Sequence, residues 1–275
     1  MPEFETLDWA LDGAVLRLRL NRPDRRNAVT HRMMQELTAA LGRVAGDPAI
    51  RVLLLSGAGG NFCAGGDLAH MLAPPEVAPG EALADRDPVA AAYRRMGDAL
   101  ALLDALPQAV VVAVDGACVG AGLGMACAAD YVIATERAKF GMPEARAGFI
   151  PSQILPYVVR RLGEGQARRL AVVARVIDGR EAFRIGAAHE LVADGAALET
   201  AVEAALRDLA WAEPTAVAEI KRLIRRAETD APADVLDDAA LSIARLLAAP
   251  AAAEGIRAFQ EKRPPAWAAP TPEDV

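Results

Sequence analysis

Apolar runs of the β type alternate with helical periodicity along the first half of the chain. Four such runs predict strands, at residues 15–20, 50–55, 110–114 and 131–134. Asn27 or Thr30 is expected to cap a helix that continues through Val44, and residues 46–48, Gly-Asp-Pro, are expected to end it. Alternation of strands and helices predicts an α/β core.

The pattern changes after Glu181, where β-type runs nearly disappear and apolar residues recur at helical spacing. Pro214, Pro232 and Pro250 stand where helices are expected to begin or break. We therefore expect a core domain over residues 1–195, followed by a helical region over residues 196–275 that covers the core or contacts another subunit.

Composition narrows the class of protein. With 275 residues, of which 53% are apolar, the chain can bury a large core. Its net charge of −7 disfavours nucleic acid and anionic membranes as partners. The 3 cysteines lack zinc-site spacing, which predicts no bound metal. The acidic start resembles no secretion signal, so we expect a cytoplasmic protein.

Two stretches of small residues follow predicted strands, at residues 61–68 and 116–124. Glycines let the main chain bend and approach a ligand closely, and a following helix adds its positive end. Two N–H groups that converge there could hold an oxygen that gains negative charge. By spacing alone, close packing of small residues is the more frequent explanation of such patterns, because glycine motifs have many false positives.

Five ordered motifs together resemble a known family, the enoyl-CoA hydratase/isomerase (crotonase) superfamily. They cover residues 20–28, 63–68, the glycine stretch that ends at Asp130, 140–144 and 259–263. The resemblance implies a crotonase (ClpP-like) spiral of ββα units with a helical C-terminal region. It also implies a homotrimer or a dimer of trimers, a coenzyme A thioester as substrate and no permanently bound cofactor.

The resemblance also assigns residues to the site. The backbone N–H groups of Ala64 and Ala121 would form the oxyanion hole, although the family usually has glycine where Ala121 stands. The nucleotide end of coenzyme A would contact Arg25, Arg26, Ala28, Gly65, Asp67 and Leu68, with Phe259 and Lys262 from the same or a neighbouring subunit. Asp24 replaces a residue that is basic in many relatives, so phosphate recognition is expected to shift to the following arginines.

Glu144 follows a Gly-Met-Pro turn that could aim its carboxylate into an apolar pocket, where its pKa would rise toward the working pH. In crotonase-like hydratases the matching glutamate works beside a second one, and Gly124 occupies that second position here. A single carboxylate must either make both proton transfers of a hydration or shuttle one proton. The first reaction is that of an enoyl-CoA hydratase, and the second is that of a Δ3,Δ2-enoyl-CoA isomerase.

We place hydration first, because residues 140–163 look most like hydratases of methylglutaconyl-CoA and isohexenylglutaconyl-CoA. Isomerisation is the alternative, and a non-catalytic acyl-CoA-binding or RNA-binding relative comes third. A distal carboxylate on the substrate would need a guanidinium, for which Arg94, Arg95 and Arg146 are candidates. The proline-rich stretch 73–90 is expected to shape the acyl pocket as a loop.

The remaining cysteine and histidine candidates receive no catalytic role. Cys63 with His70 as base is rejected as a nucleophile, since no third group orients the pair. His31 and His189 have no motif around them and are expected to be structural or surface residues.

Overall fold

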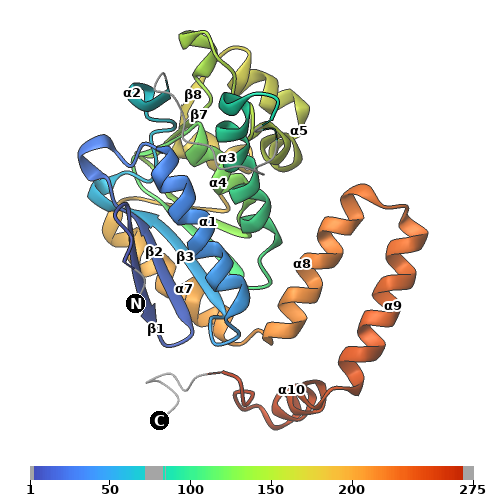
Figure 1. Cartoon of the computed structure of the whole chain (residues 1–275). Coiled ribbons are helices and arrows are strands. Elements are labelled where there is room, and N and C mark those ends of the chain that lie inside the picture. The colour runs from blue at the N-terminus through green and yellow to red at the C-terminus, as the bar shows by residue number, and fades with distance from the viewer. Residues whose placement is uncertain (1–2, 72–82, 84, 269–275) are drawn as a thin grey trace. The chain divides into compact units, whose positions relative to one another are not determined.

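The computed structural model describes residues 3–71, 83 and 85–268. The chain divides into two units, of which the first comprises Met1–Leu106 and Val110–Val202. The second comprises Pro107–Ala109 and Glu203–Val275 (Figure 1). The division falls inside the helix α7 (Gly195–Ala210).

The first unit is built around a six-stranded sheet. Its strand order is β1-β2-β3-β4-β6-β9. The strands are β1 (Leu7–Asp12), β2 (Val15–Leu20), β3 (Val52–Gly57), β4 (Ala109–Val114), β6 (Tyr131–Thr135) and β9 (Glu190–Val192). β1 pairs antiparallel with β2, whereas β2 with β3, β4 with β6 and β6 with β9 are parallel. The four expected strands are confirmed to within a few residues, and so is the α/β class.

A second sheet has three short strands in the order β5-β7-β8. They are β5 (Ala117–Val119), β7 (Lys139–Gly141) and β8 (Val176–Asp178). The sequence pattern does not predict these strands or β9, because three residues are too few to show a period of two. β5 and β7 nevertheless matter most for the site, because β5 precedes the glycine-rich turn and β7 precedes Glu144.

Helices of the first unit pack against one another in chain order. They are α1 (His31–Gly46), α2 (Leu68–Met71), α3 (Pro88–Ala105), α4 (Ala121–Ala128), α5 (Leu155–Ala171) and α6 (Gly179–Arg184). α1 packs against α3, α3 against α4, and α4 against α5 (Figure 1). The expected cap of α1 is Thr30, whose Oγ accepts from the Met33 N–H at 3.2 Å. Of the expected loop 73–90, residues 73–82 and 84 lie outside the described residues, and residues 88–90 begin α3.

The second unit is helical, as expected. Besides the end of α7, it contains α8 (Pro214–Thr229), α9 (Pro232–Ala248) and α10 (Pro250–Glu261), each of which begins at its proline. Proline suits the first position of a helix because the N–H it lacks would have no partner there. Among residues 3–71 and 85–268, no single helix is long and apolar enough to cross a membrane; only the bent pair of α9 and α10, taken together, passes that test.

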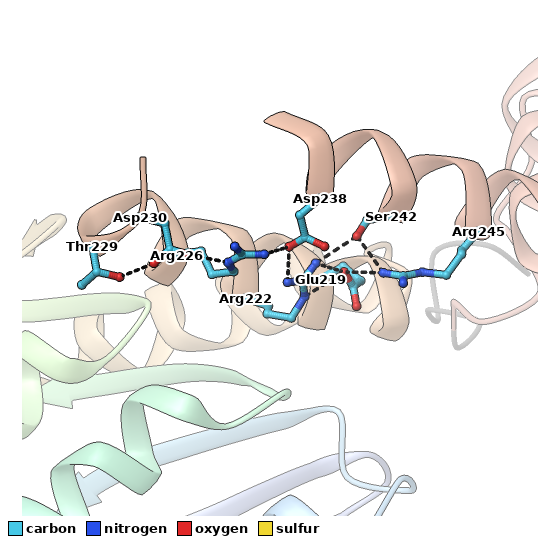
Figure 2. Close-up of polar contacts among 8 residues, drawn as sticks. All are labelled: Glu219, Arg222, Arg226, Thr229, Asp230, Asp238, Ser242 and Arg245. Carbon is cyan, nitrogen blue, oxygen red and sulfur yellow. Dashed lines mark hydrogen bonds and ion pairs between the residues drawn. The ribbon is translucent and has the colours of Figure 1, made fainter. Parts of the chain in front are cut away.

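Charged side chains join α8 to α9 (Figure 2). Asp238 of α9 accepts from Arg222 and, at 2.5 Å, from Arg226, both of α8. Ser242 Oγ accepts from Arg222 and Arg245 at 2.9 Å. The Arg226 and Asp238 side chains are 35% and 19% exposed, so this network is partly screened by water.

Candidate active site

Two glycine turns lie against each other in the first unit. Gly65 and Gly120 have positive φ angles of 95° and 53°. A Cβ on Gly65 would lie 3.3 Å from the Val119 carbonyl oxygen, and a Cβ on Gly120 would lie 3.4 Å from Gly65 Cα. The sequence needs glycine at both positions because the backbone conformation and the close approach of the two turns each leave no room for a side chain.

Backbone hydrogen bonds hold the turns together and connect them to β7. The Cys63 N–H donates to the Ala117 carbonyl at 2.7 Å, and the Val119 N–H donates to the Cys63 carbonyl at 2.9 Å. The Gly120 N–H donates to the Gly141 carbonyl at 2.9 Å. Since only Met142 and Pro143 separate Gly141 from Glu144, this last bond brings the glutamate to the second turn.

The N–H of Ala64 does not fill its expected role, because it donates to the Arg26 carbonyl at 3.0 Å. An N–H that is already bonded within the protein is not free to bind a ligand oxygen. Arg26 therefore acts here through its backbone, and it has a positive φ of 48° at the end of the turn that precedes α1.

Gly66, two residues after Ala64, has an amide that is not bonded to the backbone of the described residues. Val29 donates to the Gly65 carbonyl at 2.7 Å and accepts from the Asp67 N–H at 2.8 Å, so Gly66 lies between the two bonds. In such a parallel ladder the middle residue turns its own N–H away from the partner strand. Gly66 is exposed, and among the described residues no backbone acceptor takes its N–H.

Ala121 presents the second amide. It is the first residue of α4, so its N–H has no acceptor within the helix and points outward at the positive helix end. Gly66 and Ala121 line the same cavity as Glu144. The full lining consists of Val29, Thr30, His31, Met34, Gly66, Asp67, His70, Met71, Ala92, Tyr93, Met96, Ala121, Glu144, Phe149, Ile150, Pro151, Ser152, Gln153 and Ile154.

Glu144 contributes a carboxyl group with one unpartnered oxygen to this cavity. It begins a 3₁₀ helix (Glu144–Ala147), and its Oε2 is buried without a hydrogen-bond partner in the described part of the chain. A Cβ on Gly120 would lie 2.7 Å from Glu144 Oε1, which shows how closely the carboxylate approaches the second turn. Burial raises the pKa of the Glu144 carboxyl above its ordinary value. The group is therefore prepared to gain and lose a proton.

A hydrocarbon side chain fills the space in front of Gly124. A Cβ at this position would lie 2.3 Å from Ile154 Cγ2 and 3.4 Å from Leu100 Cδ1. Ile154 is 4% exposed and lines the cavity. The position where the resemblance leads us to expect a second carboxylate thus has no carboxyl group, and the packing of Ile154 leaves no space for a larger side chain there.

Asp67, the other acid of the cavity lining, has partners within the protein. Its Oδ2 accepts from Arg22 at 3.0 Å, and its Oδ1 lies 3.3 Å from His70 Nδ1. Burial alone would raise the pKa of Asp67, but the bonds from Arg22 and His70 outweigh it and hold the pKa below its ordinary value. The carboxylate is therefore charged and held by the protein, and its contact with coenzyme A stays a prediction.

The other residues expected at the nucleotide end lie in different surroundings. Arg25 is exposed and pairs with Asp24 at 3.6 Å. The Ala28 carbonyl accepts from Arg22 Nη1 at 2.5 Å, and Leu68 is 60% exposed on α2. Phe259 and Lys262 belong to the second unit, where Phe259 is 86% exposed. Their contact with coenzyme A stays a prediction.

Two cavity residues have no recognisable sequence signal. His31 was expected to be structural or exposed, but it lines the cavity, and burial together with Arg95 and His70 lowers its pKa. The second residue is Ile154, which lines the cavity and packs against Gly124. His189 is structural, since its Nδ1 accepts from the Val132 N–H at 2.9 Å.

Cys63 has the inert environment that was expected of it. It is fully buried, and burial raises the pKa of its thiol to about 12. Among the described residues, no group of three or more His, Cys, Asp or Glu side chains could hold a metal ion. The two amides and Glu144 lie together in the lining of the cavity, and their roles stay predictions.

Two backbone donors beside an unpaired, buried carboxyl group are characteristic of enzymes that stabilise an oxyanion while they move a proton. A family model described as enoyl-CoA hydratase/isomerase matches residues 11–270, and the chain belongs to this family.

Individual relatives agree with this assignment. The chain is 33% identical over 256 residues to a putative enoyl-CoA hydratase of Thermus thermophilus, a match that covers 92% of this chain and 97% of the relative. It is 34% identical over 261 residues to the 1,2-epoxyphenylacetyl-CoA isomerase of Escherichia coli, covering 93% and 95%. A crystal structure of an enoyl-CoA hydratase/isomerase from Marinobacter aquaeolei superposes with a TM-score of 0.90 at 40% identity, covering 96% and 100%. The crotonase fold, with its ββα units and helical C-terminal region, is thereby confirmed.

Proposed function

We propose that the chain is an enoyl-CoA hydratase that works with one carboxyl group. The N–H groups of Gly66 and Ala121 bind the thioester oxygen, and Glu144 makes both proton transfers. The buried Glu144 Oε2, which has no partner among the described residues, carries this proposal, because a carboxyl oxygen held in that state is available to a substrate.

The steps balance with one carboxyl group. The Glu144 carboxylate takes a proton from water as the water oxygen bonds to the β-carbon, and the electron pair of the double bond moves onto the thioester oxygen. The two amides stabilise the enolate so formed. Glu144, now protonated, gives its proton to the α-carbon, and the thioester carbonyl returns. A raised pKa suits a group that must act first as base and then as acid.

Polar groups that could hold the attacking water also line the cavity. They include Tyr93, Ser152, Gln153 and His31. Because the pKa of His31 is lowered, its ring is neutral at pH 7 and can accept a hydrogen bond from water.

The test uses crotonyl-CoA in ¹⁸O-labelled water with the wild-type protein and the Glu144→Gln variant. Hydration puts the label into the 3-hydroxyacyl product, and we expect Glu144→Gln to lose at least about 100-fold in kcat, as for removal of a general acid or base. Glu164→Gln, on the exposed side of α5 next to Arg168, is the control and should keep its rate. Unchanged turnover in Glu144→Gln would refute the role of this carboxyl group.

The second candidate is a Δ3,Δ2-enoyl-CoA isomerase. The packing of Ile154 against Gly124 favours it, because isomerisation needs one carboxyl group to carry a proton between the α- and γ-carbons. With a 3-enoyl-CoA as substrate, the double bond would migrate without uptake of ¹⁸O. Methylglutaconyl-CoA belongs in the same panel, since preferred hydration of that substrate would support the expected likeness to glutaconyl-type hydratases. Assembly as a trimer or a dimer of trimers and a cytoplasmic location remain expectations.

A further inference from the structure

Arg22 is a charged residue that the proposed chemistry does not use. It follows β2, and its side chain is 18% exposed. Its Nη1 donates to the Ala28 carbonyl at 2.5 Å, and both Nη1 and Nη2 donate to Asp67 Oδ2 at 3.0 Å. The guanidinium therefore connects two segments that are far apart in the sequence.

One of these segments contains Gly66, and the other pairs with the residues on either side of it. Ala28 precedes Val29, which pairs through its backbone with Gly65 and Asp67 on either side of Gly66. The Asp67 carboxylate also accepts from the Ala69 N–H at 3.2 Å, which fixes the chain just after the turn. Arg22 thus closes a ring of hydrogen bonds around Gly66, which lines the cavity.

The backbone of Arg22 is fixed as well. Its N–H donates to Asn27 Oδ1 at 2.8 Å, and Asn27 Nδ2 donates to the carbonyls of Ala58 at 2.9 Å and Asn61 at 2.7 Å. Asn27 is fully buried with a positive φ of 56°. Because both ends of the Arg22 side chain are held, a change in the guanidinium would be transmitted to the turn that carries Gly66.

We propose that Arg22 is a positioning residue that aims the Gly66 N–H at the thioester oxygen through Asp67 and the Ala28 carbonyl. This inference rests on the proposed function. The planar fork of arginine reaches a carboxylate and a carbonyl at once, which the single ammonium group of lysine cannot reproduce. An oxyanion donor that is turned away by a fraction of an ångström loses much of its effect on the transition state.

The experiment compares wild type with Arg22→Gln and Arg22→Lys by steady-state kinetics and by the carbonyl stretching band of bound, ¹³C-labelled butyryl-CoA. A saturated thioester cannot react, so its band reports the hydrogen bonds to its oxygen alone. We expect kcat to fall roughly 10- to 100-fold in both variants, with KM changed much less. The carbonyl band should move back toward that of free butyryl-CoA. Arg19→Gln is the control, since Arg19 makes a comparable but exposed pair with Asp8.

The outcomes distinguish a failure of the proposed function from a failure of the role proposed for Arg22. If wild type does not shift the carbonyl band, the oxyanion hole and the proposed function fail. If wild type shifts it and Arg22→Gln shifts it equally with unchanged kcat, the proposed function stands and Arg22 is only a structural residue. Should Arg22→Gln fail to fold, Asp67→Ala, which removes the acceptor oxygen of Arg22, is expected to show the same partial return of the band; a band at the wild-type position would overturn the proposal.

Discussion

Gly120→Ala should lower both stability and activity, and the loss of activity should be specific to this glycine. The backbone of Gly120 has φ 53° and ψ −117°, a region that alanine adopts only at a cost of about 1 to 3 kcal/mol. The new methyl group would also lie 2.7 Å from Glu144 Oε1. An ordinary contact begins near 3.4 Å, so the oxygen must retreat by at least 3.4 − 2.7 = 0.7 Å.

The two effects act on different properties. The Glu144 carboxylate ends a flexible side chain and can move away cheaply, so the contact adds little to the loss of folding free energy. Its movement nevertheless displaces the group that transfers protons, and a displacement near 1 Å can cost about 100-fold in rate. We expect kcat to fall roughly 10- to 100-fold.

Gly13→Ala provides a matched control in the turn between β1 and β2. Gly13 has φ 54°, and a Cβ there would meet nothing within 4 Å. Both variants should lower the melting temperature, measured by scanning calorimetry, while only Gly120→Ala should lower kcat for the substrate identified in the hydration assay. An undiminished kcat in Gly120→Ala, or an equal loss in Gly13→Ala, would refute the placement of the carboxylate beside Gly120.

Two further predictions concern stability. Because the pKa of Glu144 is raised in the folded protein, its protonated form is stabilised at low pH and that stability is lost as pH rises. The melting temperature of Glu144→Gln minus that of wild type should therefore be larger at pH 8 than at pH 4, and a constant difference would contradict the burial. Gly124→Ala should lower the free energy of unfolding by about 1 to 3 kcal/mol, because the new methyl group clashes with Ile154. In an Ile154→Ala background the same change should cost little. Gly165→Ala is the control, because a Cβ on this residue of α5 would meet nothing within 4 Å. Urea denaturation should show no loss of unfolding free energy for it, and a loss equal to that of Gly124→Ala would count against the clash.

Much of the fold follows from local patterns in the sequence. The strand at Val15–Leu20 and the helices that begin at Pro214, Pro232 and Pro250 lie where the pattern predicts them. Their signals are local, since a strand shows a period of two and proline suits the first turn of a helix. The three-residue strand β7 is not predictable in this way, because its pairing with β5 and β8 alone defines it.

The resemblance predicts which turns form the candidate site, but not which backbone N–H group of a turn is left without a partner. The resemblance selects the stretch 63–68, part of which lines the cavity, yet it assigns the donor to Ala64, whose N–H is bonded within the protein, whereas no backbone acceptor among the described residues takes the Gly66 N–H. The difference depends on pairing across the fold: the Arg26 carbonyl takes the Ala64 N–H, and Val29 orients the backbone around Gly66. No property of the segment itself shows which of its N–H groups a distant segment will use.

Asp67 shows that a motif residue can serve the fold of the site. Its carboxylate bonds Arg22, His70 and the Ala69 N–H, while its contact with coenzyme A stays a prediction. The same bonds hold the turn that presents Gly66. In an activity assay, a substitution of Asp67 would look like the loss of a substrate-binding residue. Only a probe of the thioester carbonyl distinguishes that role from a role in holding the turn. In the proposed mechanism, Arg22 and Asp67 therefore set the direction of the Gly66 N–H without contacting the reacting atoms.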